Sequence, residues 1–283
     1  MKAILLILLA IITLSAYGQK DMTIERHRMK LNAKHRGIRR VVNYDVTSSD
    51  VPKEFDGVKI VFMADIHYKS RLKEKGLESI KSVLMEIKPD IILLGGDYQE
   101  GCEYVEPMVD VCTAWKAPLG MAGVMGNNDY ERCTELIRER FAEKGLRILE
   151  GDTMSIRRGE EEIIIAGAKN VYKGRETEPS PTREIADSSF VILLTHTPDY
   201  VEDVDIAHTD LALAGHLHGG QVTLFGLWAP VNPSHYGRRF LKGVKRNSAG
   251  IPVITSTGIG TSRANIRLFA PSEIIMITLH NRQ

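Results

Sequence analysis

Side chains that can bind metal ions follow five short apolar runs of this chain, in a fixed order. The motifs are Asp65-Ile66-His67, Gly95-Gly96-Asp97, Gly126-Asn127-Asn128-Asp129, Leu194-Thr195-His196-Thr197 and Gly215-His216-Leu217-His218-Gly219-Gly220. Each motif alone is weak evidence, because a turn or a solvated polar pair explains it equally well. Five such clusters together are hard to explain structurally. Carboxylate, amide and imidazole groups that converge from several strand ends are what two divalent metal ions need.

The apolar runs before these motifs are typical of buried strands. They cover residues 60–64, 91–94, 121–125, 190–194 and 211–214. Apolar spacing predicts helices at 72–87, 104–115 and 131–143, and shorter patterns predict strands at 38–45, 147–149, 153–157, 162–166, 252–256 and 273–279. A helix-rich half followed by a strand-rich half predicts two sheets packed face to face with helices outside.

The ordered motifs resemble those of the calcineurin-like metallophosphoesterase superfamily, whose pattern is D-x-H, G-D, G-N-H-[DE], H and G-H-x-H. The resemblance covers residues 57–280 and is closest to the bacterial YkuE/YaeI-type phosphodiesterase branch, with further similarity at 219–221, 236–239, 258–262 and 266–267. It implies an α+β fold of the αββα type. In that fold two mixed β-sheets pack face to face, helices cover both outer sides, and a two-metal site lies along the strand ends.

The resemblance also implies seven metal ligands, with one carboxylate shared by both ions. The first ion would be bound by Asp65, His67, His218 and the bridging Asp97. The second ion would be bound by Asp97, Asn127, His196 and His216. Because mixed imidazole, amide and carboxylate ligands suit borderline ions, we expect two divalent metal ions, Mn, Fe or Zn. An all-oxygen site would suit Mg²⁺ or Ca²⁺ better.

One position departs from the family pattern. The usual His after the Gly-Asn pair is Asn128 here, and we assign Asn128 to the catalytic position. An amide cannot donate a proton as a general acid, although it can hydrogen-bond a developing oxyanion. The departure therefore predicts a preference for phosphodiesters or pyrophosphates over monoesters with poor leaving groups.

Two further loops carry charged residues. In the loop at 228–240, His235, Arg238 and Arg239 are candidate substrate-binding residues that would contact a phosphate or its leaving group. The alternative is a packed loop whose Arg side chains extend along the surface. The loop at 171–181, with four charged residues and two prolines, is expected to be a solvated surface loop.

The main functional hypothesis is a dinuclear metal-dependent phosphoesterase. It would hydrolyse a phosphodiester or pyrophosphate bond by in-line attack of a metal-bridging hydroxide. One alternative is a membrane-surface hydrolase of lipid head groups, such as a UDP-2,3-diacylglucosamine pyrophosphatase, and another is a non-catalytic metal-binding protein. The expected partner is thus a phosphorylated small molecule or a lipid head group. A formal net charge of +1 gives no indication of nucleic acid binding.

The first 18 residues have the pattern of a secretory signal peptide or a membrane anchor. Lys2 precedes an apolar run at 3–14, and Ala16 and Gly18 occupy the −3 and −1 positions of a cleavage site. The run is shorter than the roughly 20 residues of a spanning helix, but an uncleaved anchor stays open. We therefore expect the protein to be exported to the periplasm or cell envelope, or to be membrane-anchored.

The segment 19–45 is interpreted as a basic juxtamembrane segment followed by a first strand, and 46–283 as the phosphoesterase domain. Eight Lys or Arg residues at 20–40 would contact an anionic membrane surface or remain in a solvated linker. If the apolar stretch stayed in the membrane, this charge would favour a cytoplasmic catalytic domain.

The three cysteines match no ligand position. Cys102 and Cys112 are too far apart on a predicted helical segment for easy pairing, and an odd number leaves at least one thiol unpaired. We interpret Cys102, Cys112 and Cys133 as small apolar residues without a redox function.

Overall fold

The computed structural model describes residues 21–30, 37–169, 178–226 and 228–283, and their strands form two sheets. The seven-stranded sheet has the order β1-β2-β13-β3-β4-β5-β6 and the six-stranded sheet has the order β11-β12-β10-β9-β8-β7. The strands of the first are β1 (Met22–Met29), β2 (Arg40–Ser48), β13 (Glu273–Asn281), β3 (Lys59–Met63), β4 (Ile91–Leu94), β5 (Gly120–Gly123) and β6 (Arg147–Ile148). Those of the second are β11 (Gly243–Arg246), β12 (Pro252–Thr255), β10 (Leu211–Ala214), β9 (Phe190–Thr195), β8 (Glu161–Gly167) and β7 (Asp152–Arg158).

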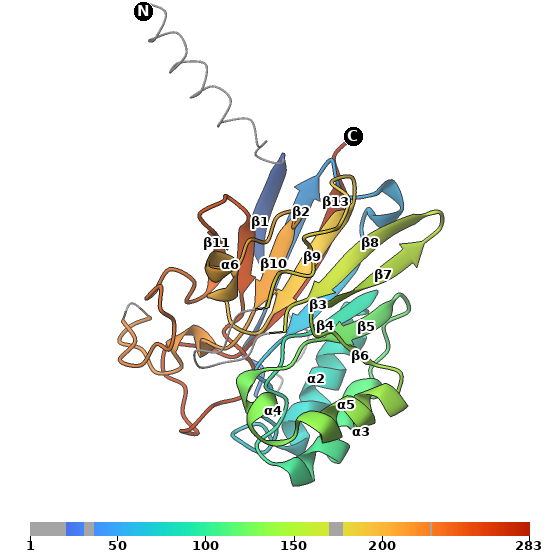
Figure 1. Ribbon diagram of the computed structural model, residues 1–283. Coiled ribbons are helices and arrows are strands. Elements are labelled where there is room, and N and C mark those ends of the chain that lie inside the picture. Colours follow the sequence, from blue (N-terminus) through green and yellow to red (C-terminus); the bar gives the residue numbers. More distant parts are fainter. Residues whose placement is uncertain (1–20, 31–36, 170–177, 227) are drawn as a thin grey trace, which may run out of the picture.

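Both sheets are mixed, and they pack face to face (Figure 1). β3, β4, β5 and β6 run parallel to one another, and so do β8, β9, β10 and β12. Antiparallel strands complete both sheets, as β1 on β2, β13 on β3, β7 on β8 and β11 on β12. Because the carboxyl ends of parallel strands meet at one edge, each sheet gathers its strand-end residues there.

Alternation along a single strand shows why the layers form. In β3, Ile60 and Phe62 face the second sheet, whereas Val61 and Met63 face the helices, and all four are fully buried. A strand with apolar residues on both faces needs a cover on each side, because successive side chains point to opposite faces. The second sheet supplies one cover and the helical layer supplies the other.

The helical layer lies on the outer face of the seven-stranded sheet (Figure 1). Its helices are α2 (Glu74–Ile87), α3 (Val105–Thr113), α4 (Asn127–Arg132) and α5 (Thr134–Glu143). α2 places Leu77, Ile80, Val83, Leu84 and Ile87 in the core at the spacing of one helix face. It ends at Lys88, whose left-handed conformation closes the helix before Pro89.

The outer face of the six-stranded sheet has a thinner cover. The short helix α6 (Tyr200–Asp203) and loop residues such as Ile206 and Phe240 pack on it. Short 3-10 turns η1 (Lys53–Phe55), η2 (Cys102–Tyr104) and η3 (His218–Gly220) complete the regular structure of the described residues. The predicted fold class, an αββα arrangement with two mixed sheets, is confirmed.

The strand β1 corrects the prediction for the basic segment. The first strand begins at Met22 and not near residue 38, because residues 22–29 pair antiparallel with β2 along their whole length. Five of the eight side chains in β1 are exposed, as an edge strand permits, so the polar sequence gave no apolar pattern to recognise. Residues 22–29 are therefore part of the fold and not a solvated linker.

The cysteines give a second correction. Cys102 and Cys133 form a disulfide, and only Cys112 is a buried free thiol, so the interpretation of Cys102 and Cys133 as small apolar residues was wrong. The bond joins the segment after β4 to the end of α4 across 31 residues. A loop of that length corresponds to about 3–4 kcal/mol of stabilisation from chain entropy.

The helix predicted at 131–143 is broken into α4 and α5 at Cys133. The expectations for residues 1–18 and for most of the loop at 171–181 lie outside the described residues. Within the described residues, no helix is both long and apolar enough to cross a membrane.

Candidate metal centre

Five strand-end segments bring the seven predicted ligands together at one edge of the sandwich. Asp65 and His67 follow β3, Asp97 follows β4, and Asn127 begins α4 after β5. From the second sheet, His196 follows β9, and His216 and His218 follow β10. Residues from strands in different sheets thus face one another across the end of the interface.

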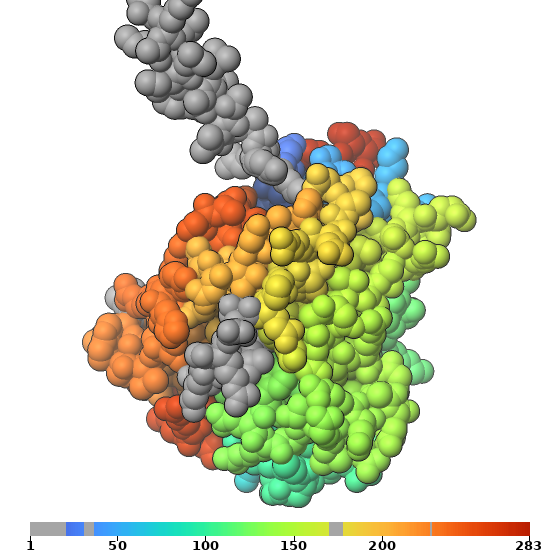
Figure 2. Space-filling model, in the orientation of Figure 1, coloured from blue at the N-terminus to red at the C-terminus, as the bar shows by residue number. Residues whose placement is uncertain are grey.

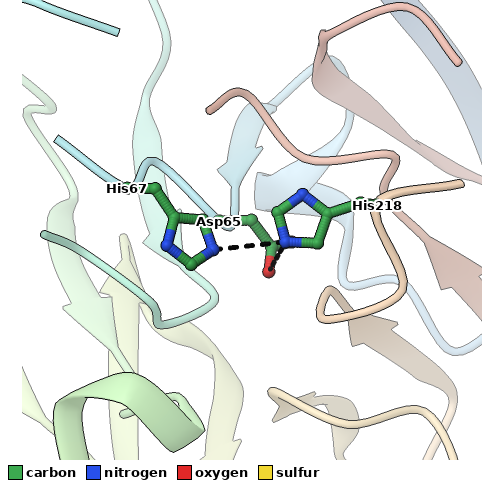
Figure 3. A group of neighbouring side chains, drawn as sticks. All are labelled: Asp65, His67 and His218. Carbon is green, nitrogen blue, oxygen red and sulfur yellow. Dashed lines mark hydrogen bonds and ion pairs between the residues drawn. The ribbon is translucent and has the colours of Figure 1, made fainter. Parts of the chain in front are cut away.

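The first cluster consists of Asp65, His67 and His218, whose ligand atoms lie within 4.8 Å of one another (Figure 3). His67 Nε2 is 3.2 Å from His218 Nε2, and His218 Nε2 is 3.5 Å from Asp65 Oδ1. Two imidazole nitrogens and a carboxylate oxygen that point at one another fit a borderline cation.

The second cluster consists of Asp97, His196 and His216. His196 Nε2 is 3.2 Å from His216 Nδ1 and 3.2 Å from Asn127 Oδ1, so the amide oxygen of Asn127 faces this cluster. Asp97 Oδ2 lies 3.5 Å from His196 Nε2 and also 3.4 Å from His67 Nε2 in the first cluster. One carboxylate oxygen therefore stands between the two clusters, which is the position of a bridging ligand.

The backbone at the site is held in an unusual conformation. Five of the seven predicted ligands have positive φ, namely Asp65, His67, Asp97, His216 and His218. Non-glycine residues rarely adopt this region, and each costs on the order of 1–3 kcal/mol that the surrounding fold must offset. Such strain concentrated on one set of polar residues indicates selection for where the side chains point.

Two glycines permit the close approach of the β4 and β5 loops. A Cβ on Gly126 would lie 2.1 Å from Asp97 Oδ1, and a Cβ on Gly96, whose φ is +85°, would lie 2.3 Å from the backbone nitrogen of Gly126. Without side chains at these positions, the Asn128 backbone N–H donates to Asp97 Oδ1 at 2.9 Å. The glycines therefore place the bridging carboxylate against the start of α4.

Neighbouring groups orient two of the imidazoles. His67 Nδ1 donates to Glu100 Oε1 at 2.5 Å, and His196 Nδ1 donates to the Gly95 carbonyl at 2.7 Å. In both rings Nδ1 donates away from the site, so Nε2 is the nitrogen that faces the site and would bind a metal ion once its proton is displaced.

Arg267 contacts a third imidazole of the site, that of His218. Its buried guanidinium donates to His218 Nδ1 at 3.2 Å and to the carbonyls of Thr257 and Gly260 at 2.7 and 2.8 Å. Burial lowers the pKa of His218 well below its usual value, and the charges of His67 and Arg267 add to this effect. His218 is therefore neutral, the form in which an imidazole binds a metal.

The pKa shifts of the predicted ligands show how strongly these groups interact. Burial would raise the pKa of Asp97, but the charge and hydrogen bond of His196, followed by the charge of His67, hold it well below its usual range. Burial would lower the pKa of His196, but Asp97 raises it to about 10. Burial raises the pKa of Asp65 to about 6. Positive charge at His196 thus compensates Asp97, and a metal ion would replace that proton.

Asn128 and Asp129 have different roles in the same motif. The Asn128 side-chain amide donates to Glu100 Oε1 at 3.3 Å and lines the cavity above the clusters. Asp129 is fully buried and accepts from the backbone N–H groups of Asp97 and Gly126 at 2.7 and 2.8 Å. Asp129 therefore fixes the loop that carries Asp97, whereas Asn128 is open to a substrate.

The clusters lie at the floor of an open cavity of about 760 Å³. Asp97, Asn127, His216 and His218 are among its lining residues. Residues 99–101, 131–132, 220–222, 230–233 and 262–264 also line it. A phosphate ester can therefore approach both clusters from solvent.

The predicted substrate-binding residues are not among those that line this cavity. The His235 backbone N–H donates to Asp199 at 2.7 Å, and Arg239 forms an ion pair with Glu202 at 2.7 Å. Arg238 is exposed in the same turn. The structure thus fixes His235 and Arg239 against α6 and its N-terminal residue, and substrate contact by the three residues stays a prediction.

Sequence reasoning missed Glu100, Asp129 and Arg267 as residues of the site. Glu100 follows Asp97 by three positions but belongs to no recognised motif. Asp129 and Arg267 lay inside quoted motifs, and only their burial and hydrogen bonds reveal their roles.

Comparison with known proteins identifies the family. The family model described as calcineurin-like phosphoesterase matches residues 58–220, which include all seven predicted ligands. The chain therefore belongs to the calcineurin-like phosphoesterases, a family of metal-dependent phosphoric ester hydrolases. The residues present fit that chemistry, because two candidate clusters of nitrogen and oxygen ligands lie side by side. The Asp97 carboxylate is close to a histidine nitrogen in each cluster.

Several bacterial relatives align over most of the chain. The uncharacterised metallophosphoesterase YkuE of Bacillus subtilis is 26% identical over 83% of this chain and 84% of its own length. The phosphodiesterase YaeI of Escherichia coli is 29% identical over 78% of this chain and 82% of its own. Among solved structures, TT1561 of Thermus thermophilus matches 71% of this chain and 90% of that chain, with 13% identity and a TM-score of 0.48.

Proposed function

We propose that this protein is a dinuclear metal-dependent phosphoesterase that hydrolyses a phosphodiester or pyrophosphate bond. The observation that carries the proposal is the position of Asp97, whose Oδ2 lies 3.4 Å from His67 and 3.5 Å from His196. A buried carboxylate between two ligand clusters, on the floor of an open cavity, supports two ions held close together.

In the proposed reaction the metal ions would supply most of the catalysis, and the other residues of the cavity would bind the substrate. Two divalent ions, held by Asp65, His67, His218, Asp97, Asn127, His196 and His216, would activate water at neutral pH and neutralise phosphoryl oxygens. Asn128 would contact the substrate through its amide, which donates a hydrogen bond but no proton. Arg132 and Arg263 line the cavity and are suited to pair with the other phosphate oxygens.

Relatives support the ester class and not a particular molecule. One aligned relative is named a phosphodiesterase, and this chain's Asn128 agrees with diester chemistry. Neither the family nor the relatives favour the UDP-2,3-diacylglucosamine pyrophosphatase alternative. We therefore propose which type of bond is cleaved. For the substrate we propose only its class, which is a phosphorylated small molecule or a lipid head group.

Metal reconstitution tests the proposed function. Chelated protein should be inactive on an aryl phosphodiester, and Mn²⁺ should restore activity as about two ions bind per chain. Elemental analysis and hydrolysis of bis-(4-nitrophenyl) phosphate provide the two measurements. Trace metal only after reconstitution, or full activity after chelation, would contradict the proposal.

We also propose that the protein acts outside the reducing cytoplasm. The signal-like pattern at 1–18 and the Cys102–Cys133 disulfide support export, because structural disulfides persist in oxidising compartments. Protein isolated from its host should begin at Gln19 if the segment is cleaved, or retain Met1 in the membrane fraction if it is an anchor. Cys102 and Cys133 should resist alkylation until they are reduced. A soluble protein with Met1 and two alkylated thiols at these positions would contradict export.

A further inference from the structure

Exposed apolar side chains gather on two loops beside the metal centre. Nine large hydrophobic side chains are exposed in the part of the chain that the structure describes, and seven of them lie in the loops 221–233 and 262–269. We call these seven the apolar rim: Leu224, Phe225, Trp228, Val231, Ile266, Leu268 and Phe269. Phe225 is 70% exposed and Trp228 is 56% exposed. A concentration of this kind marks an interaction surface, whereas single exposed hydrophobic residues do not.

The two loops form one unit because backbone hydrogen bonds join them. The Thr223 N–H donates to the Leu268 carbonyl at 3.0 Å, and the Leu268 N–H donates to the Gln221 carbonyl at 2.9 Å. At the tips, the rings of Phe225 and Phe269 lie 5.4 Å apart. The apolar side chains are therefore presented together on an ordered support.

The rim adjoins the cavity and projects from the molecule. Val231 belongs both to the rim and to the cavity lining, and the neighbouring residues Val222 and Ala264 also line the cavity. Figure 1 shows the two loops, in orange and red, extending from the ligand-bearing edge of the sandwich, and Figure 2 shows the orange segment as a protrusion on one flank. Whatever binds the rim therefore lies next to the entrance of the metal centre.

The part of the sequence that contains the rim has basic residues but no acidic residues. No Asp or Glu occurs between Asp210 and Glu273, whereas this interval has seven Lys or Arg residues. Lys242 lies against the rim, since its ammonium donates to the Gly226 carbonyl at 3.3 Å, and Arg263 is exposed in the second loop. Asp199 and Asp203 accept hydrogen bonds from Ser234 and Tyr236, and Glu100 and Glu131 lie among the residues that line the cavity beside the rim.

We propose that the apolar rim docks on the surface of an anionic lipid bilayer. Protruding Trp, Phe and Leu side chains suit the boundary between head groups and acyl chains, and the surrounding basic residues suit anionic head groups. A second copy of this chain is a poorer occupant, because two such basic surfaces would repel each other. If the proposed function holds, docking brings the metal centre to the level of lipid phosphates.

This surface is separate from the predicted membrane contact at residues 20–40. Met22, where the described chain enters the fold, pairs with Ser48, whereas the other end of β1, Met29, pairs with Val41. Because β2 runs parallel to β13 and β13 runs antiparallel to β3, Ser48 lies at the end of the sheet away from Asp65. Met22 and the apolar rim therefore lie at opposite ends of the sandwich.

Tryptophan fluorescence gives a direct test with the full chain. The sequence has two Trp residues, of which Trp115 is buried and Trp228 belongs to the rim. Vesicles of phosphatidylcholine and phosphatidylglycerol with brominated acyl chains should quench and blue-shift the emission of Trp228. Trp228→Phe should remove the quenched component. No catalysis enters this measurement, so its failure is distinct from a failure of the proposed function.

Variants identify which features bind. Phe225→Ser with Phe269→Ser should weaken vesicle binding by about tenfold or more, because two apolar side chains no longer insert. Lys242→Gln with Arg263→Gln should weaken binding to anionic vesicles and leave binding to phosphatidylcholine alone unchanged. Met85→Ser is the matched control, since Met85 is 69% exposed on α2 and belongs to neither loop of the rim. Thermal unfolding verifies that each variant is folded.

Three results would overturn the proposal. The first is a protein that binds no vesicles. The second is vesicle binding during which the emission of Trp228 stays unquenched, which would assign membrane contact to another segment. The third is a dimer, seen by sedimentation without vesicles, in which Trp228 emission is already blue-shifted, which would assign the rim to a second copy of the chain.

Discussion

Asp97→Asn should lower phosphodiesterase activity by about 10³-fold or more, a loss of at least about 4 kcal/mol of transition-state stabilisation. The Asp97 carboxylate lies within 3.5 Å of a histidine nitrogen in each cluster. An amide of the same shape keeps an oxygen for the Asn128 N–H but removes the negative charge between the two clusters. We expect the variant to retain at most one tightly bound ion.

The control for this variant is Asp110→Asn, which removes an exposed carboxylate that pairs with Lys144 on the helical layer. It should keep normal metal content and activity. Elemental analysis and kcat/KM for an aryl diester distinguish the two variants, and circular dichroism verifies their folding. An Asp97→Asn protein with two bound ions and more than a tenth of the activity would show that the two clusters do not share this ligand.

The strands that precede the predicted ligands could be predicted because two features of the sequence indicate each of them. Apolar runs such as residues 91–94 predict buried strands, and the polar residue that follows, here Asp97, would have no reason to interrupt the run without a function. The αββα arrangement came from the family resemblance together with the order of helices and strands. Local pattern and tertiary structure agree at these positions, which is why the predicted strands and the fold class are confirmed.

The parts that sequence did not predict depend on long-range contacts. β1 has few apolar residues, and its pairing with β2 decides its conformation. Cys102 meets Cys133 because the segment after β4 and the helix after β5 converge at the metal centre. Arg267 becomes a support of His218 only when the loop at 257–270 folds beneath the site. Spacing along the chain contains none of this information.

The wild type should hydrolyse aryl phosphodiesters readily and alkyl monophosphates poorly. A poor alkoxide leaving group needs a proton in the transition state, and general acid catalysis typically contributes about 10²–10⁴-fold. Asn128 cannot supply that proton, although its side chain lines the cavity and reaches Glu100 at 3.3 Å. An aryl leaving group is a weaker base and needs less help.

Asn128→His should therefore raise the ratio of monoesterase to diesterase activity, by about tenfold or more if the new imidazole acts as an acid. Glu100, whose carboxylate lies beside the Asn128 amide, can accept one N–H of the imidazole and keep it protonated. Asn128→Gln is the matched control, because it changes the size of the side chain and adds no acid. The measurement compares glycerol phosphate with an aryl diester at the same metal loading. If the wild type already cleaves both substrates equally fast, another group donates the proton, and the specificity does not depend on Asn128.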